Sequence, residues 1–273
     1  MSPLLAIEQL TVSFVQYERG LRRREVVALS GMDLTADRGQ VVALVGASGA
    51  GKTLLAHAVL GMLPPNATES GTIQYDGRPL DHAERRRLAG QEIALLPQSV
   101  DYLDPLATIG RQVTRSAQLA TQLGARAGRR AGHRVAATVL AARGLGPEVL
   151  RRYPHELSGG MIRRVLLTMA TLGDPHLILA DEPTPGLPRE DVSAVLQEFR
   201  ALADDGRAVV LITHELGGAL EVADTVVICR EGRTIETVTP AGFRTGELRD
   251  PYTKALWQAL PANGFAVPEE QSC

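Results

Sequence analysis

The sequence predicts an α/β protein with a mainly parallel sheet, an N-terminal antiparallel β region and an inserted helical region. Two short apolar segments, Val41–Val45 and Leu177–Ala180, read as strands that are covered on both faces. Such segments alternate with helical stretches, which is the pattern of a parallel core. A glycine-rich loop directly follows the first of them. From about residue 81 to 165 the pattern is mainly helical, and this stretch is too long to be a loop.

The elements follow in order along the chain. Leu5–Phe14 alternates apolar and polar residues, which predicts a strand, and further short strands are expected up to Thr35. A helix is expected over Thr53–Leu63, because Pro64 and Pro65 stop it. Another strand is predicted at Gly71–Gly77. After the helical region, strands are predicted at 177–180, 209–212, 225–228 and 234–238, with helices at 191–203 and 217–222 between them.

The composition excludes several classes of protein. Hydrophobic residues make up 44% and charged residues 22% of the 273 residues, as in an ordinary globular protein. A net charge of −2 gives no electrostatic reason to expect nucleic acid as a partner. No apolar run reaches the ~18 residues of a membrane span, and the N-terminus lacks a secretory pattern, so we expect a cytoplasmic protein. The two cysteines, Cys229 and Cys273, are too few for a four-thiolate cluster.

The segment 46–53 matches the phosphate-loop pattern Gly-x-x-x-x-Gly-Lys-Thr between a strand and a helix. Glycines let the backbone wrap a phosphate closely, and the helix N-terminus presents its N–H groups to the anion. Lys52 is expected to reach the β- and γ-phosphates, and the Thr53 hydroxyl to hold Mg²⁺. The sequence therefore predicts a nucleoside triphosphate site formed by Gly46, Ala47, Ser48, Gly49, Ala50, Gly51, Lys52 and Thr53.

A second acidic site ends the strand that begins at Leu177. Asp181 suits Mg²⁺, and Glu182 suits the polarisation of a water for in-line phosphoryl transfer. Alone, an Asp-Glu pair after a strand often only caps a neighbouring helix. With a phosphate loop upstream, catalysis is the better interpretation.

The segment Leu157-Ser158-Gly159-Gly160, between these two sites, resembles the signature of the ATP-binding-cassette (ABC) superfamily. In that family a serine, two glycines and a helix N-terminus contact the γ-phosphate held by a partner subunit. The resemblance implies a P-loop ATPase domain over residues 1–260, with the helical subdomain at about 81–165 inserted. Residues 261–273 are expected to form a flexible tail.

The resemblance assigns further residues in the family's order. Gln98 corresponds to the loop glutamine that touches Mg²⁺ or the attacking water and links to the membrane partner. His214 ends an apolar strand in the position of the switch histidine that contacts the γ-phosphate. Phe14 is the candidate for stacking on adenine, with Tyr17 as the alternative, although either aromatic residue can instead belong to the core.

Three longer segments resemble one branch of the family, the nickel and oligo/dipeptide importer ATPases. They are residues 98–112, residues 153–160 and the Asp250–Leu256 segment with its Pro-Tyr-Thr element. Longer members of the peptide branch carry a C-terminal extension, sometimes with cysteines for an iron–sulfur cluster. Because this sequence ends soon after the Pro-Tyr-Thr element, its length favours the nickel or metal-chelate type.

The sequence departs from the family pattern at two places. Pro188 stands where an aspartate usually connects the two nucleotide sites of a dimer, and proline has neither a side-chain acceptor nor an N–H group. Ile162-Arg163-Arg164 stands where a Gln-Arg pair is more usual. These departures predict two unequal composite sites in a heterodimer with a homologous ATPase.

The resemblance thus implies an ATP-hydrolysing motor of a bacterial importer with ATP and Mg²⁺ as cofactors. The implied partners are a second ATPase, two membrane-spanning permease subunits and, indirectly, an extracytoplasmic solute-binding protein. The chain would lie peripherally on the cytoplasmic face of the inner membrane. Two alternatives stay open: an exporter motor, which shares all the chemistry, and a nucleic-acid-associated cassette of repair, chromosome maintenance or translation. The interval from Lys52 to Ser158 has neither the heptads nor the paired cysteines typical of the latter class.

Overall fold

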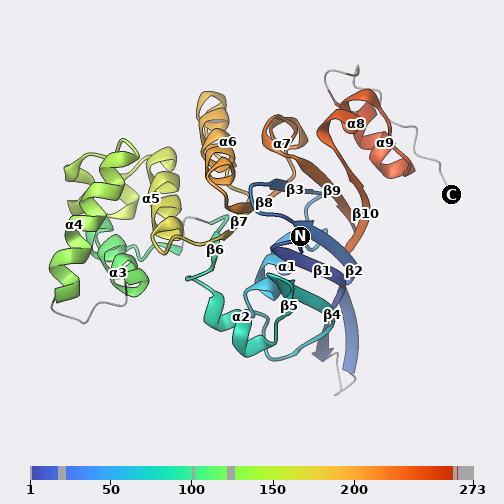
Figure 1. The fold of residues 1–273 in the computed structure, drawn as a ribbon, viewed down its shortest axis with the longest axis horizontal. Helices are drawn as coiled ribbons and strands as arrows, with labels where there is room; N and C mark the ends of the chain where they lie inside the picture. The colour runs from blue at the N-terminus through green and yellow to red at the C-terminus, as the bar shows by residue number, and fades with distance from the viewer. Residues whose placement is uncertain (1, 18–22, 100–101, 122–126, 261–262, 264–273) are drawn as a thin grey trace.

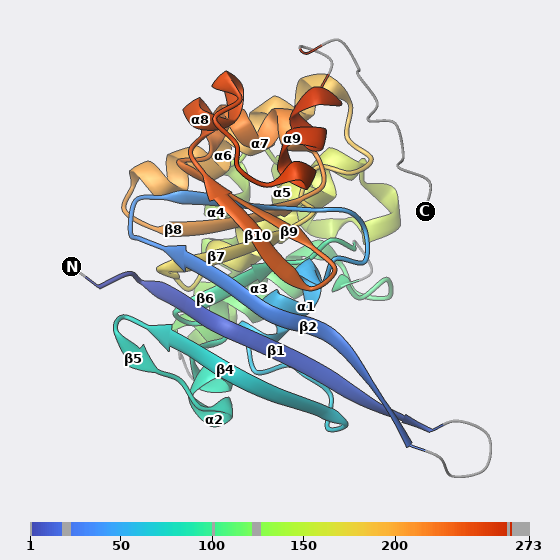
Figure 2. The same cartoon turned by 90° about the vertical axis from the view of Figure 1, so that its right-hand side faces the viewer.

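The computed structural model describes residues 2–17, 23–99, 102–121, 127–260 and 263. It contains two sheets, which lie one against the other (Figure 1, Figure 2). The first is antiparallel, with the order β2-β1-β4-β5. Its strands are β1 (Leu5–Tyr17), β2 (Arg23–Ala36), β4 (Ala67–Tyr75) and β5 (Arg78–Pro79).

The second sheet has the order β10-β9-β3-β8-β7-β6. Neighbours from β9 to β6 are parallel, and β10 joins β9 as an antiparallel edge strand. Residues of β3, β7 and β8 are buried throughout, which explains why these strands are wholly apolar in sequence apart from Asp181 and Thr213 at the ends of β7 and β8. The strands are β3 (Val41–Val45), β6 (Ile93–Leu96), β7 (Leu177–Asp181), β8 (Ala208–Thr213), β9 (Thr225–Arg230) and β10 (Arg233–Val238).

Helices cover both faces of this sheet, and a further group of helices lies to one side of it. Helices α3, α4 and α5 form a separate group beside β6 and β7, coloured green to yellow in Figure 1. The helices are α1 (Lys52–Val59), α2 (His82–Leu88), α3 (Ile109–Thr121), α4 (Ala127–Ala142), α5 (Gly159–Thr171), α6 (Arg189–Asp204), α7 (Leu216–Val222), α8 (Pro240–Thr245) and α9 (Pro251–Gln258), with short 3₁₀ turns η2 (Pro147–Arg151) and η3 (Pro154–Glu156).

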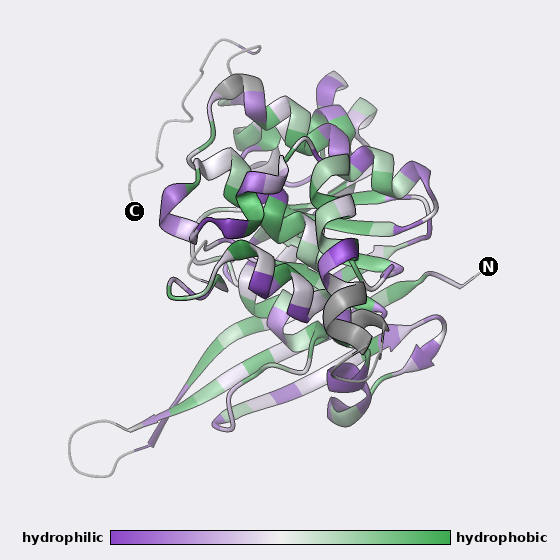
Figure 3. Cartoon of the chain, turned by 90° about the vertical axis from the view of Figure 1, so that its left-hand side faces the viewer, coloured by the Kyte–Doolittle hydropathy of each residue, from purple (hydrophilic) through white to green (hydrophobic). Residues whose placement is uncertain are grey.

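Two hydrophobic cores lie on the two faces of the parallel sheet. One is built around Phe199 and Phe243 beneath the helices, and the other joins α1 to the antiparallel sheet. Figure 3 shows the strands in the middle of the molecule coloured mainly green, for hydrophobic residues. No helix of the described residues is long and apolar enough to span a membrane.

The prediction of α/β architecture is confirmed, and one expected boundary is wrong. The stretch that reads as helical from about residue 81 contains a strand, β6, which pairs with β7 in the parallel sheet. Ile93–Leu96 is a four-residue apolar run, and periodicity alone cannot distinguish such a run from a helical segment. The helical group therefore begins after Pro97, with α3. The predicted tail 261–273 lies outside the described residues except for Asn263.

Candidate functional site

Four segments with predicted functional residues leave the parallel sheet at the same edge. The phosphate loop follows β3, Gln98 follows β6, Glu182 follows β7 and His214 follows β8. Since these four strands are parallel neighbours in the order β3-β8-β7-β6, their carboxyl ends meet. Ligands of open α/β sheets bind at this edge, outside the carboxyl ends of the strands. The topology therefore gathers residues that lie far apart in the sequence.

The phosphate loop owes its shape to close packing at two glycines. A Cβ atom added to Gly46 would lie 2.4 Å from the carbonyl oxygen of Cys229 on β9. Gly51 has a φ of 87°, and a Cβ there would lie 2.2 Å from Leu29 Cδ2 of β2. Both positions thus require glycine, one for space and the other for space and conformation. Between them, Ala47, Ser48 and Gly49 are exposed.

Lys52 opens helix α1, and its ammonium group is buried within the site. Its Nζ atom donates hydrogen bonds to the carbonyl oxygens of Gly46 (2.8 Å) and Ala47 (3.1 Å). It also lies 3.8 Å from Glu182 Oε1. This ammonium group is already removed from water in the folded protein. It can therefore turn from the loop carbonyls towards an incoming phosphate without a further cost of desolvation.

Asp181 is buried at the end of β7 and has an unusual surrounding for a carboxylate. Burial raises its pKa, while an interaction with the Thr53 hydroxyl opposes this shift. Its Oδ1 atom is buried and has no hydrogen-bond partner in the part of the chain described here. A buried carboxylate oxygen without a partner costs free energy unless a cation binds it. Asp181 and Thr53 are therefore chemically suited to hold a hard cation such as Mg²⁺.

Glu182 combines backbone strain with a defined hydrogen-bond partner. Its φ is 44°, a left-handed conformation that is rare for residues other than glycine, and its N–H donates to the carbonyl oxygen of Ile212 at 2.8 Å. The carboxylate is buried, and His214 Nδ1 lies 2.8 Å from its Oε2 atom. The His214 side chain itself is half exposed. The structure thus brings Lys52, Asp181, Glu182 and His214 together.

Other predicted residues lie outside this cluster. Gln98 has an exposed side chain just beyond β6, next to the strand that carries Asp181. Phe14 is partly buried and packs against the core that joins α1 to the antiparallel sheet. The Tyr17 side chain lies outside the described residues.

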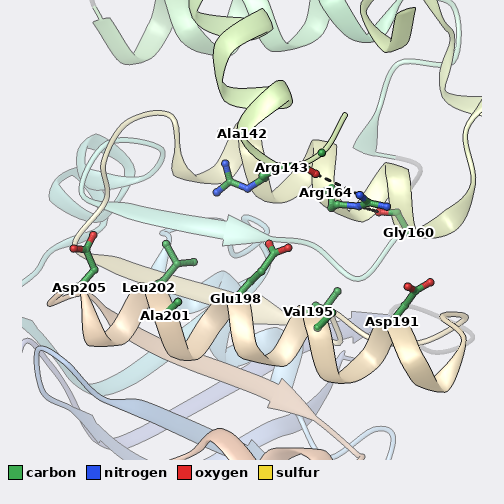
Figure 4. A pocket seen from close by; sticks show the side chains of 12 residues that line it. Ala142, Arg143, Gly160, Arg164, Asp191, Val195, Glu198, Ala201, Leu202 and Asp205 are labelled. Carbon is green, nitrogen blue, oxygen red and sulfur yellow. Dashed lines mark hydrogen bonds between the residues drawn. The ribbon is translucent and has the colours of Figure 1, made fainter. Parts of the chain in front are cut away.

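Ser158, Gly159 and Gly160 start helix α5 on the side of the helical group. Ser158 is the N-cap, and its Oγ atom accepts a hydrogen bond from the Met161 N–H. The two glycines face the start of α6: an added Cβ at Gly160 would lie 3.5 Å from Asp191 Oδ2. Gly160 and Asp191 stand on opposite walls of a cleft of about 740 Å³ between α5 and α6 (Figure 4). Among the described residues, no hydrogen bond or ion pair joins Ser158, Gly159 or Gly160 to the phosphate loop.

Comparison with known proteins identifies the family. The model of the family described as "ABC transporter" matches residues 29–185. The chain belongs to the ABC transporter family. As an ABC ATPase it binds ATP and couples ATP hydrolysis to transport.

Two curated relatives and one solved structure illustrate the similarity. The ABC ATPase is 30% identical over 277 residues to the oligopeptide transport ATP-binding protein OppD of Bacillus subtilis, covering 98% of this chain and 74% of the relative. It is 31% identical to the glutathione import ATP-binding protein GsiA of Escherichia coli, covering 96% of this chain but only 42% of that longer protein. A dimeric ATP-binding cassette in a post-hydrolysis state with ADP and phosphate superposes with a TM-score of 0.73 at 24% identity, covering 86% of this chain and 98% of the other.

The structure of the ABC ATPase adds residues that the sequence reasoning missed. Arg163 of α5 is buried and contacts the backbone at Gln98. The sequence signal for a buried Arg163 was its place among the apolar residues of the inner face of α5, three residues before Leu166. The Thr184 hydroxyl donates to Glu215 Oε2 at 3.2 Å and so links the segments that carry Glu182 and His214.

Proposed function

We propose that this chain is the ATP-hydrolysing motor subunit of a bacterial importer for small peptides, bound peripherally at the cytoplasmic face of the membrane. The name of GsiA, an import protein, supports the direction. The solutes named for the two relatives, an oligopeptide and the small peptide glutathione, support the cargo class. We further propose that residues up to about 260 form the ATPase domain. Because the chain covers only 42% of the length of GsiA, the similarity applies to only a part of that protein. It therefore supports only a part of the proposed importer.

The convergence of Lys52, Asp181, Glu182 and His214 at one sheet edge carries the proposed mechanism. The phosphate loop binds the triphosphate through its N–H groups, and Lys52 leaves the loop carbonyls for the β- and γ-phosphates. Glu182, oriented by His214 Nδ1, accepts a proton from the attacking water. We also assign to His214 the contact with the γ-phosphate.

The residues around Asp181 fit Mg²⁺, so we include this ion among the proposed cofactors. Thr53, Asp181 and Gln98 would hold it, directly or through water. When bound, Mg²⁺ neutralises charge on the phosphates during transfer. We assign adenine stacking to Phe14, since its ring is partly exposed beside the α1 core.

We propose that the second half of each nucleotide site comes from another ATPase subunit. Ser158 caps the 13-residue helix α5, and Ser158 and Gly159 are exposed at its start, which suits an anion held by a partner. Pro188 caps α6 without any side-chain hydrogen bond, so it offers no acceptor to a neighbouring site. We therefore propose a heterodimer with a homologous ATPase that supplies one complete site. Two permease subunits and a solute-binding protein complete the proposed importer.

Uptake in a deletion strain tests the direction and the solute. Labelled dipeptide, labelled glutathione and radiolabelled nickel, with and without a chelator, are supplied in parallel to the deletion strain and its complemented derivative. Loss of peptide or glutathione uptake alone is expected. Loss of nickel uptake alone would replace peptides by a metal chelate as the cargo. Complementation with Glu182→Gln is the matched control for transport driven by hydrolysis.

Purification through a tag on this chain tests the assembly. Two membrane-spanning subunits and a second ATPase are expected to accompany it, and a solute-binding protein is expected to bind the purified complex. Copurification with nucleic acid, or with a membrane protein that works without any solute-binding protein, would contradict import.

A further inference from the structure

The signature helix α5 is attached directly to the loop that carries Gln98. Arg163 lies on the inner face of α5, and its side chain is 6% exposed. Its Nη1 atom donates a hydrogen bond to the Pro97 carbonyl oxygen at 2.9 Å, and its Nη2 atom donates to the Gln98 carbonyl oxygen at 2.7 Å. The two acceptors belong to consecutive residues, so one guanidinium group holds both peptide units that flank the Gln98 Cα atom.

This arrangement fixes the backbone of Gln98 more firmly than a single hydrogen bond could. A guanidinium group is planar and presents its donors as a rigid fork, so two bonds to adjacent carbonyls define the orientation of both peptide planes. The direction in which the exposed Gln98 side chain leaves the backbone depends on these planes. The contact thus sets where the amide of Gln98 points.

The charge of Arg163 is not explained by an ion pair. No salt bridge joins Arg163 to an acidic side chain within the described part of the chain, and burial alone lowers its pKa. Glu198, which lines the same small cavity of about 10 Å³, interacts with Arg143 and Arg164 instead. A buried cation that is compensated only by two carbonyls is a costly way to fill a core position, and a neutral side chain would fill it at lower cost.

The helix that carries Arg163 also carries the serine and glycines of the signature. Arg163 lies five residues after Ser158, or about 7.5 Å along the axis at ~1.5 Å per residue. A displacement of the start of α5 therefore reaches the Gln98 loop through one side chain. Arg164, the next residue, makes its hydrogen bonds to the carbonyl oxygens of Gly160 and Arg143, which both belong to the helical side.

We propose that Arg163 is a positioning residue for Gln98, which makes the Gln98 loop a rigid extension of the signature helix. This inference rests on the proposed function for the role of Gln98 at the nucleotide. Arg163 itself touches neither the phosphate loop nor the Asp181–Glu182 pair through any described hydrogen bond, so it acts only through the loop that it holds.

A double-mutant cycle on ATP turnover tests the proposal in the complex purified through this chain. Arg163→Gln is expected to lower kcat about tenfold, because a catalytic group displaced by a fraction of an ångström loses that much or more. The Kd for ATP should stay within about twofold of the wild-type value, since the phosphate loop is untouched. The double variant Gln98→Ala/Arg163→Gln should be no slower than Gln98→Ala alone. Independent, multiplicative losses in the double variant would overturn the proposal.

Amide hydrogen exchange of the full chain without nucleotide gives a readout that does not depend on activity. Arg163→Gln is expected to speed exchange in peptides that cover residues 95–99 and to leave peptides of the phosphate loop unchanged. Arg143→Gln is the matched control: it removes a partly buried arginine whose side chain donates a hydrogen bond to Thr171 of α5, within the helical group. Unchanged exchange at 95–99 in Arg163→Gln would overturn the anchoring.

Arg163→Lys covers the case in which the glutamine variant does not fold. Lysine keeps the charge and one or two bonds but not the rigid fork, so kcat is expected about threefold below wild type and exchange at 95–99 between the two extremes. Wild-type values in both measurements would overturn the proposal. The proposed function fails separately, if the wild-type complex neither binds nor hydrolyses ATP, and the exchange result then still decides whether Arg163 holds the loop.

Discussion

The phosphate-loop end and the signature end of this ABC ATPase are built on different principles. At the phosphate-loop end, residues that follow β3, β7 and β8 meet each other: Lys52 lies 3.8 Å from Glu182, and Glu182 lies 2.8 Å from His214. At the signature end, Ser158 caps its own helix, and the glycines face only Asp191 and the turn before α6. The groups that meet at the first end all belong to this chain, whereas the second end is a helix N-terminus that none of these groups contacts through a described hydrogen bond or ion pair.

This difference predicts that substitutions at the two ends affect ATP binding and ATP turnover separately. Changes at the phosphate-loop end should alter what a single chain does with ATP, because all the groups that meet there belong to it. Changes at the signature end should leave ATP binding intact and affect only the turnover that needs a second subunit.

Glu182→Gln is expected to lower ATP turnover by about 1,000-fold, since glutamine cannot accept the proton of the attacking water. ATP affinity should change little, because Glu182 lies beyond the phosphate loop. Single-turnover hydrolysis and equilibrium binding of a fluorescent ATP analogue measure the two quantities. Turnover retained within tenfold would remove Glu182 from the role of base.

Ser158→Arg places a long cation at the exposed start of α5, where a partner's nucleotide is expected. Turnover of the assembled complex should fall by about 100-fold, while ATP binding to the isolated chain stays normal. Thr138→Arg, on the exposed side of α4, is the matched control and should not affect turnover. If Ser158→Arg weakens ATP binding to the isolated chain, the two ends are not separable.

Gly46→Ala and Gly49→Ala compare two glycines of the same loop. Gly46 has no room for a Cβ because the Cys229 carbonyl oxygen would lie 2.4 Å away, so a loss of about 2 kcal/mol in the free energy of unfolding is expected. Gly49 faces open space and has only a φ of 83° to oppose alanine, which predicts about 1 kcal/mol. Urea unfolding measures both, and a larger loss at Gly49 would contradict this account of the loop.

Pro188→Asp should have the smallest effect, a change of a few-fold in turnover or in the cooperativity of ATP dependence in the assembled complex. An aspartate would give the start of α6 the acceptor that proline lacks. ATP titration of turnover measures it, with Ser193→Asp on the exposed side of the same helix as control. An identical profile would remove Pro188 as a cause of unequal sites.

The prediction of the phosphate-loop end rests on local patterns. The loop at 46–53 and the strand before Asp181 are short, contiguous signals, and the parallel order of the strands brings them together. Strand β6 could not be predicted in the same way, because Ile93–Leu96 is too short and too uniformly apolar to show a period. Its partner β7 lies more than 80 residues away, and pairing with that strand decides its conformation.

The contacts of Arg163 could not be predicted from the sequence, for a related reason. A charged residue on the apolar face of α5 shows that something unusual is buried there, but its acceptors are backbone carbonyls about 65 residues earlier. Backbone acceptors carry no side-chain signature. Likewise, the strain at Glu182 follows from the way β7 ends beside Ile212, which no local pattern encodes.

The thiol of Cys229 lies beneath the phosphate loop, where the Gly46 backbone covers it. It is fully buried, and burial raises its pKa to about 11. At pH 7 a thiol with that pKa is ionised in about one molecule in 10,000, and only the thiolate reacts readily with oxidants. The nucleotide site should therefore keep working when the redox state of its surroundings changes, and alkylating reagents that attack exposed thiols should leave ATP binding untouched.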